Sequence, residues 1–438
     1  MQAYAAAIRA SDTVRRIGKV VRLSGLAIES IGPDCAVGDV CELFSKRSGL
    51  RIKAEVVALQ QQRVMLMPYA DLGGIGLDCD VVVSGSSASL PVGAGLLGRV
   101  IDAFGQPLDG RPMPALAELR PLRGEPLNPL DRPPIREVLE TGVRCIDALL
   151  TIGRGQRVGI FAGSGVGKST LLGMVARQMR ADVNVIGLIG ERGREVREFI
   201  DKSLGAEGLA RSVVVVATSD QPAAVRVRAA YAATAIAEHF RDTGLDVMLT
   251  MDSVTRFAMA RREIGLSVGE PPTARGYTPS VFAELPRLLE RCGTSGSGGS
   301  ISALYTVLVE GDDLNDPIAD ALRSILDGHV VMSRQLANHG HYPAIDVLHS
   351  ISRLLPELAS PQEQQLARAA VAMLSVYEKN HQMIEIGAYR AGSNAQLDRA
   401  MRLMPEFNRW LQQEIDGPVT RAQALQALTA LMAQEARK

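Results

Sequence analysis

The segment AGSGVGKS, which runs from Ala162 to Ser169, places a lysine and a hydroxyl directly after a run of small residues. A strand-like stretch, VGIF, precedes it, and its last residues open a helix-like stretch, KSTLLGMVARQM. Small residues let backbone N–H groups turn inward around a polyphosphate, and the N-terminus of a helix adds partial positive charge. The segment therefore predicts a phosphate-binding loop that holds a nucleotide such as ATP.

The residue types within this loop predict separate roles. We expect Lys168 to reach the β and γ phosphates and the Ser169 hydroxyl to bind Mg²⁺. The first position is Ala162 instead of the usual glycine, which leaves the end of the motif, Gly167 to Ser169, intact. The residues expected to bind the nucleotide are Gly163, Ser164, Gly165, Val166, Gly167, Lys168, Ser169 and Thr170.

A metal ion in such a site needs a second ligand from the protein. Asp252 ends the apolar run DVMLTMD, so it falls at the carboxyl end of a buried strand, where parallel sheets bind their ligands. This position predicts that Asp252 holds Mg²⁺, through water. The alternative role for Asp252 is that of an N-cap for the helix-like stretch VTRFAMARREI.

A second strand-like run, VNVIGLIG, is followed at once by charges of both signs, from Glu191 to Glu198. The ordinary interpretation is a solvated helix start with local salt bridges. Beside a phosphate-binding loop, however, Glu191 can polarise a water molecule that attacks the γ phosphate. Arg192 would then stabilise developing charge, and Glu195 would orient a metal-bound water. A domain that only holds a nucleotide needs none of these groups, so the run favours hydrolysis.

The pattern of apolar, polar and turn residues along the chain predicts the elements that position these groups. Residues 16–92 contain short strand-like runs separated by turn residues, which predicts a small β-barrel. Residues 93–355 include a proline-rich strap and then apolar strands alternating with helices, which predicts a parallel sheet covered on both faces. Residues 356–438 are helical in pattern. Residues 1–15 are either a short docking segment or disordered.

Composition excludes several classes of protein. Lys plus Arg equals Asp plus Glu, at 48 each, so no net field recruits nucleic acid or anionic lipid. The five cysteines are odd in number and form no CxxC pair, which favours a reducing compartment. No apolar run approaches the roughly 18 residues of a membrane span. We expect a soluble cytosolic protein whose membrane association comes only through partners.

Longer segments resemble a known family. GLLGRVIDAFGQPLDG (residues 95–110), AGSGVGKST, GERGRE and PAIDVLHSIS (residues 343–352) are similar to the α/β subunits of rotary ATPases. Within that superfamily, residues 269–293, 310–329 and 333–346 most resemble the ATPases of type III protein export, the flagellar enzymes above all and the virulence injectisome enzymes next. The resemblance covers residues 16–435 and is densest in 93–355. It implies a RecA-like α/β core between the barrel and a C-terminal helical domain.

The resemblance also implies roles for particular residues. Glu191 becomes the catalytic, base-like residue, and Arg192 adjoins it. Arg353 becomes an arginine finger that enters the site of a neighbouring subunit, although a lone arginine after a strand is usually a surface residue. Tyr342 becomes the residue that stacks on adenine. Because a finger works in trans, the family implies a closed homohexameric ring.

The same family supplies expected partners and a location. These are a stator-like regulator at the N-terminus, a stalk protein in the ring, an export gate, chaperones and unfolded cargo. The expected location is the cytoplasm, at the inner face of the cell membrane. The injectisome role stays open as an alternative to the flagellar one.

Two other classes use the same core. A ring-shaped RNA translocase needs basic loops or aromatic platforms, and this chain has neutral charge and a single tryptophan, Trp410. The second class is a structural subunit of a rotary ATP synthase, which holds a nucleotide without hydrolysing it. Its non-catalytic members carry glutamine where this chain has Glu191, so this chain resembles the active members.

Overall fold

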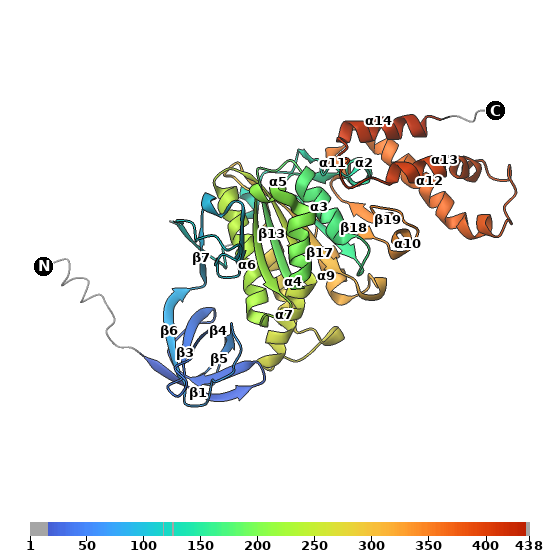
Figure 1. Cartoon of the computed structure of the whole chain (residues 1–438). Coiled ribbons are helices and arrows are strands. Elements are labelled where there is room, and N and C mark those ends of the chain that lie inside the picture. Colours follow the sequence, from blue (N-terminus) through green and yellow to red (C-terminus); the bar gives the residue numbers. More distant parts are fainter. Residues whose placement is uncertain (1–15, 117, 125–126, 435–438) are drawn as a thin grey trace.

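The computed structural model of the chain describes residues 16–434, apart from residue 117 and residues 125–126 (Figure 1). The predicted docking segment at residues 1–15 lies outside the described residues. Within the described part, no helix has both the length and the apolar character that a membrane crossing requires.

The N-terminal strands close into an antiparallel barrel with the order β1-β2-β5-β4-β3-β6. Alternating residues of β4 such as Ile52, Ala54 and Val56 are buried, so each strand turns one face to the barrel interior. This agrees with the barrel predicted from the short strand-like runs. The strands are β1 Ile17–Ser24, β2 Ala27–Ile31, β3 Asp39–Phe44, β4 Arg51–Gln60, β5 Arg63–Pro68 and β6 Asp80–Ser87.

The centre of the molecule is a nine-stranded sheet, in the order β19-β18-β12-β17-β15-β13-β14-β8, with β16 paired to β17. All neighbours along this order pair in parallel except β18 and β19. The strands are β8 Arg99–Asp102, β12 Arg157–Ala162, β13 Val183–Glu191, β14 Ser212–Thr218, β15 Asp246–Asp252, β16 Gly293–Thr294, β17 Ser300–Leu308, β18 Gly328–Met332 and β19 Ile345–Ser352.

Both faces of this sheet are covered, which explains why its central strands are largely apolar. In β13, Val185 and Ile189 join the hydrophobic cluster on one face, while Ile186 and Leu188 join the cluster on the other. Helices α6 (Ala223–Asp242) and α7 (Val254–Ser267) supply the first cluster. Helices α2 (Arg144–Leu149) and α3 (Lys168–Gln178) supply the second.

Further helices complete these layers and the C-terminal end. After β13, α4 runs into a π-helical turn, η3. These helices are α4 Gly193–Glu198, η3 Phe199–Leu204, α5 Gly205–Ala210, α8 Pro279–Leu289, α9 Pro317–Ile325, α10 Arg334–Asn338, α11 Leu355–Leu358, α12 Pro361–Glu385, α13 Ala395–Leu411 and α14 Arg421–Met432.

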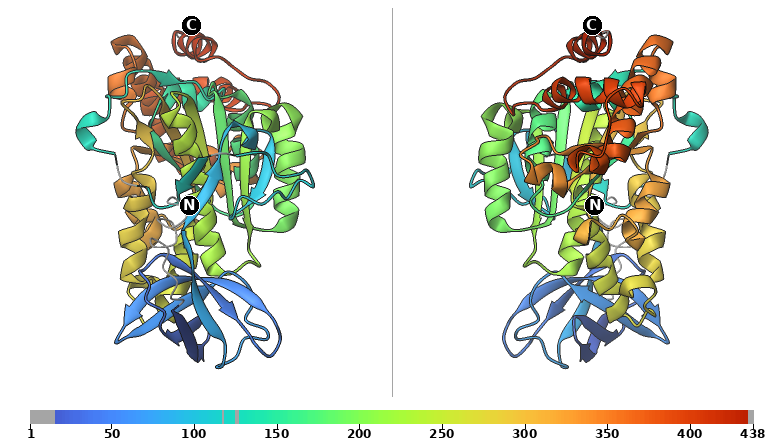
Figure 2. Two further views of the ribbon diagram at one scale, coloured as in Figure 1. Left: turned by 90° about the vertical axis from the view of Figure 1, so that its left-hand side faces the viewer. Right: turned by 90° about the vertical axis from the view of Figure 1, so that its right-hand side faces the viewer.

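The barrel and the C-terminal helices lie at opposite ends of the molecule, with the sheet between them (Figures 1 and 2). Helices α12, α13 and α14 share their hydrophobic cluster with α2 and α3, so the helical end packs directly on the central layers. The domain limits at residues 92 and 355 stay predictions. Strand β7 (Ser89–Val92) follows the barrel and leads to β8 in the sheet. It pairs with β9 (Glu118–Pro121).

A buried ion pair fastens the end of β9 to the core. Arg291 and Glu238 form two hydrogen bonds of 2.8 and 2.6 Å, and each side chain is only 4% exposed. Arg291 also donates to the carbonyl of Leu122, at 2.6 Å. Removing one partner of such a pair leaves the other charge buried without compensation, which is more costly than losing a surface pair.

We therefore predict that Glu238→Gln lowers the free energy of unfolding by about 3 kcal/mol and the thermal midpoint by several degrees. The matched control is Arg51→Ala, which breaks the exposed pair with Glu42 on the barrel. That control should change the unfolding free energy by less than about 0.5 kcal/mol. Calorimetry on the two variants measures the difference, and equal midpoints would contradict the prediction.

Candidate active site

The phosphate-binding loop lies between the end of β12 and the start of α3. Strand β12 ends at Ala162, and α3 begins at Lys168. Gly167, the N-cap of α3, has φ +90°, a left-handed conformation that is strained for residues with a side chain. The loop therefore delivers the chain into α3 with the helix N-terminus open, which is the arrangement that binds anions.

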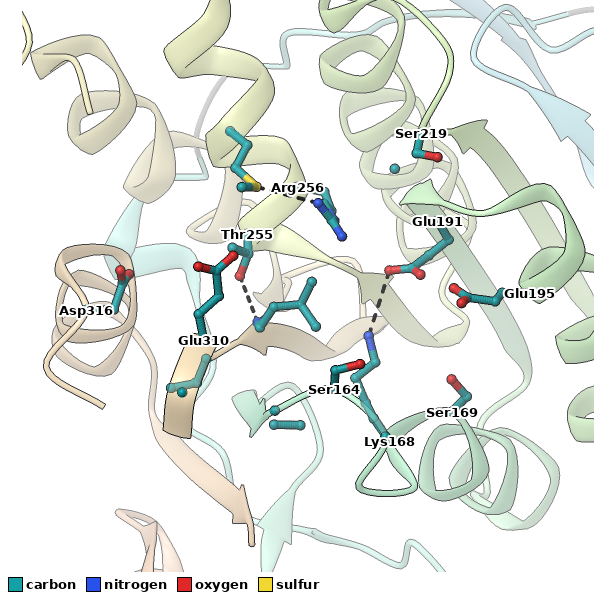
Figure 3. Close-up of a pocket in the computed structure, with 18 of the residues that line it drawn as sticks. Ser164, Lys168, Ser169, Glu191, Glu195, Ser219, Thr255, Arg256, Glu310 and Asp316 are labelled. Carbon is teal, nitrogen blue, oxygen red and sulfur yellow. Dashed lines mark hydrogen bonds and ion pairs between the residues drawn. The ribbon is translucent and has the colours of Figure 1, made fainter. Parts of the chain in front are cut away.

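Lys168 joins two carboxylates that come from different strands. Its Nζ lies 2.5 Å from Oδ1 of Asp252, at the end of β15. The same Nζ lies 3.8 Å from Oε1 of Glu191, at the end of β13 (Figure 3). Thr306, on β17 at the other side of β15, donates its hydroxyl to the same Asp252 oxygen at 2.7 Å. The parallel strands end at one edge of the sheet, and this edge brings the predicted groups together.

Asp252 does not cap the helix that follows it. The N-cap of α7 is Ser253, whose hydroxyl accepts a hydrogen bond from the Arg256 N–H. The alternative role for Asp252 as an N-cap is therefore wrong. Its carboxylate is 4% exposed and bound to Lys168 and Thr306, so it is free of helix capping and available beside the phosphate-binding loop.

A bulge at Gly190 directs Glu191 toward the loop. The register of β13 against β14 shifts between Ile189 and Glu191, and Gly190 has φ +72°. A Cβ on Gly190 would also lie 2.8 Å from the Cβ of Arg256, so a side chain is excluded twice over. Burial and the nearby Asp252 carboxylate raise the pKa of Glu191, and the Lys168 ammonium opposes that rise.

The rest of the charged run is largely the solvated helix start of the ordinary interpretation. Arg194 pairs with Glu198 at 3.3 Å, and Arg197 pairs with Asp201 at 2.5 Å, all on the exposed surface. Arg192 is 80% exposed and pairs with Glu195 at 3.3 Å. Both Arg192 and Glu195 still line the pocket, so they lie at its rim while Glu191 lies deeper.

The pocket in front of the loop has a volume of about 820 Å³, within the range of small-molecule sites. Ser164, Lys168 and Ser169 face it from the loop, and Glu191 and Glu195 face them from across the pocket (Figure 3). Other predicted loop residues that line it are Gly163, Gly165, Gly167 and Thr170. Val166 does not line the pocket, because its side chain packs into the core.

The oxygen donors suit a hard divalent cation. The Ser169 hydroxyl and the carboxylates of Asp252 and Glu195 are of the type that Mg²⁺ prefers. Within the described residues no group of three or more His, Cys, Asp or Glu side chains can hold a metal ion. A cation would thus need ligands from the phosphates and from Ser169 as well as from a carboxylate.

Tyr342 and Arg353 occupy different positions relative to this pocket. The Tyr342 ring lies beside the loop, since a Cβ on Gly167 would be 3.4 Å from the Tyr342 Cε1 atom. The ring is 47% exposed, which leaves its surface open to a base. Arg353 follows β19, is exposed, and donates to the Arg323 carbonyl at 3.0 Å. It is not among the residues that line the pocket of its own chain.

Four further arginines line the pocket and were not predicted from the sequence. Arg256 lies in the first turn of α7, and its buried Nε has no hydrogen-bond partner. Its place four residues after Asp252 was a usable signal, because the start of a helix after such a strand faces the same edge of the sheet. The other three, Arg262, Arg275 and Arg334, gave no such signal.

Comparisons with known proteins agree with this geometry. The family model described as "ATP synthase alpha/beta family, nucleotide-binding domain" matches residues 142–352. A second, described as "T3SS EscN ATPase C-terminal domain", matches residues 359–430.

Whole-length relatives carry the same similarity. The flagellum-specific ATP synthase of Bacillus subtilis (strain 168) is 55% identical over 431 residues, which cover 98% of either chain. The type 3 secretion system ATPase of Xanthomonas euvesicatoria is 49% identical over 95% of this chain and 94% of its own.

Two solved structures are similar over almost the whole chain. The assembled ATPase EscN of enteropathogenic Escherichia coli superposes with a TM-score of 0.90 at 42% identity, covering 95% of this chain and 100% of EscN. EscN in complex with its central stalk EscO gives a TM-score of 0.86 at 41% identity, with the same coverage. With its barrel, nucleotide-binding core and helical C-terminal end, this chain belongs to the ATP synthase α/β family and, within it, to the flagellar and type III secretion ATPases.

Proposed function

We propose that this chain hydrolyses ATP with Mg²⁺ and that the reaction energises export of unfolded flagellar proteins. The observation that carries the proposal is the Lys168 ammonium, held at the phosphate-binding loop between the Asp252 and Glu191 carboxylates. The higher identity to the flagellum-specific relative than to the type 3 secretion relative favours flagellar cargo over the injectisome alternative.

Binding would use the loop and the basic wall of the pocket. Backbone N–H groups of the loop and the Lys168 ammonium hold the β and γ phosphates. Arg256, whose Nε is free of protein partners, is placed to meet the terminal phosphate. Tyr342 stacks on the adenine ring.

Ser169, Asp252 and Glu195 would hold Mg²⁺, either directly or through water. When bound there, the cation withdraws charge from the phosphate oxygens and so makes the γ phosphorus easier to attack. Glu195 also pairs with Arg192 at the rim, so binding at this carboxylate and the position of Arg192 are linked.

Glu191 would position and deprotonate the attacking water. Its Oε1 is buried and has no hydrogen-bond partner, which leaves an acceptor for a water proton. The pKa of this carboxyl group is raised toward neutral pH, and a general base works best when its pKa lies near the working pH. Arg192 and Arg256 stabilise the charge that develops on the phosphate as the bond to the leaving oxygen breaks.

Arg353 would complete the site of an adjacent subunit. It is exposed and lies away from its own pocket, which suits a residue that acts in trans. We propose a homohexameric ring, and the assembled state of the relative EscN supports a ring-forming chain. The complex of EscN with the stalk EscO supports a stalk protein as one partner.

The remaining partners rest on the family alone. They are a stator-like regulator bound at residues 1–15, an export gate, chaperones and unfolded cargo. In this arrangement the protein works in the cytoplasm at the inner face of the cell membrane, which it reaches through these partners.

The first test replaces the proposed base. Glu191→Gln should keep nucleotide affinity, because the amide preserves the shape of the side chain, and should lower kcat by about 10²- to 10⁴-fold. The matched control is Glu198→Gln, which changes an exposed carboxylate in the same charged run and should leave kcat unchanged. Phosphate release and binding of a fluorescent nucleotide measure the two effects. Full turnover in the Glu191 variant would remove it from the mechanism.

The second test asks whether Arg353 acts across an interface. Arg353→Ala and Lys168→Ala should each lower turnover by about 10³-fold or more as pure rings. Random mixing of the two variants should restore about one quarter of wild-type activity, since some interfaces then combine an intact lysine with a neighbour's intact arginine.

The control for this experiment mixes Lys168→Ala with Glu191→Gln. Both changes then damage the same side of the site, so no subunit in the mixture supplies both groups and no activity should return. Steady-state ATPase rates at several mixing ratios distinguish the cases. A mixture of the Arg353 and Lys168 variants that stays inactive at every ratio would contradict action in trans.

A further inference from the structure

A tight turn follows β17 directly above the phosphate-binding loop. The short helical turn Glu310–Asp312 contains Gly311 at φ +65° and Asp312 at φ +58°. Aspartate is one of the few side chains that tolerate this left-handed conformation. The turn is joined to the loop at its base, where the Val309 N–H donates to the Ala162 carbonyl at 3.1 Å.

Arg334, the first residue of α10, connects this turn to the loop. Its Nε donates to Oδ2 of Asp312 at 3.1 Å, and its Nη1 donates to the backbone carbonyl of Ser164, also at 3.1 Å. A Cβ on Gly163 would lie 2.5 Å from the Asp312 Oδ1 and 2.6 Å from the Arg334 Nη2. The ion pair therefore packs directly on the loop, and a side chain at Gly163 would have to displace it.

The segment that follows the turn has anchors of its own. Arg275 binds this segment, donating to Asp313 at 2.5 Å and to Asp316 at 2.9 Å. Asp316 also caps α9 through the N–H of Ile318. Because these contacts anchor Asp313 and Asp316, Asp312 is attached to a fixed segment, and its bond to Arg334 can hold the loop in position.

The bond to the Ser164 carbonyl has a direct effect on the phosphate donors. A peptide unit is planar and trans, so the Ser164 carbonyl and the Gly165 N–H point in opposite directions. Fixing the carbonyl on Arg334 therefore fixes the direction of the Gly165 N–H, one of the amides expected to bind phosphate. A loop already in its binding conformation loses less entropy when the nucleotide arrives.

We propose that Arg334 and Asp312 are a positioning pair that holds the phosphate-binding loop ready for the nucleotide. The proposal rests on the proposed nucleotide-binding function of the loop and extends it to two residues outside the motif. Half-exposed ion pairs of this kind, with side chains 45% and 44% exposed, add little to the stability of a fold. The pair should thus affect nucleotide affinity and leave folding almost unchanged.

The test measures nucleotide binding and turnover separately in the full chain. Arg334→Ala should raise the Kd for a fluorescent ADP analogue with Mg²⁺ by about tenfold, the usual effect of losing a charged hydrogen bond. KM for ATP should rise similarly, with kcat within about threefold of wild type. Arg334→Lys should recover part of the affinity, because lysine reaches the carbonyl or the carboxylate but lacks the fork that binds both.

Two further variants make the test specific. Asp312→Asn keeps a residue that tolerates the left-handed turn and should raise Kd by about threefold. Arg368→Ala is the control. This exposed arginine on α12 donates to Gln364 and is not among the residues that line the pocket. It should leave Kd, KM and the thermal midpoint unchanged.

Unchanged Kd and KM in Arg334→Ala would overturn the proposal, as would a fall in kcat alone. If Arg334→Ala does not fold, Asp312→Asn decides, and a wild-type Kd in that variant overturns the proposal. Failure of the unaltered chain to hydrolyse ATP would refute the proposed function instead. The binding measurement does not require hydrolysis, so the two failures are distinguishable.

Discussion

One ammonium group shared by two buried carboxylates is the constraint on which the site depends. Lys168, Glu191 and Asp252 all have side chains that are at most 15% exposed, so water screens their charges weakly. Glu191 is left with a raised pKa because a single cation does not compensate two carboxylates and the cost of burial. Such a site gains from a ligand that brings both anionic phosphates for the lysine and a cation for the carboxylates.

The fold places these three groups next to one another. They lie on three different elements, and only a sheet whose strands run in parallel places the ends of β13 and β15 beside the start of α3. Strand β17 separates β12 from β15, and its Thr306 fills the gap with a hydroxyl bonded to Asp252. Hydrophobic layers on both faces hold the strands in place, since a slip of one residue would exchange the side chains that pack against the two layers.

The sequence predicted the parts of the site whose signals are local. The phosphate-binding loop is contiguous, and Glu191 and Asp252 each follow a mostly apolar run, so their positions could be inferred from the run alone. The barrel, the parallel core and the helical end were predictable from periodicity for the same reason. Arg353 was identified only through the family resemblance, because nothing in its neighbours marks it.

What the sequence did not predict depends on contacts between distant segments. Arg334 reaches Ser164 across 170 positions, and no local pattern marks either partner. The bulge at Gly190 needs both a backbone angle and a contact with Arg256 that only the folded chain provides. The N-cap of α7 at Ser253 and the π-helical turn after α4 are shifts of a few residues, a scale at which tertiary packing overrides propensity.

The outward-facing Arg353 has a consequence for the unassembled molecule. A subunit diffusing alone has the loop, the lysine and both acidic groups, but the guanidinium that would serve a neighbour lies on its own exposed surface, bonded to the Arg323 carbonyl. Free subunits at low concentration would then bind ATP without hydrolysing it. The rate of ATP hydrolysis would rise more steeply than protein concentration, because it depends on the number of interfaces between subunits. Assembly itself would be the switch that prevents idle turnover.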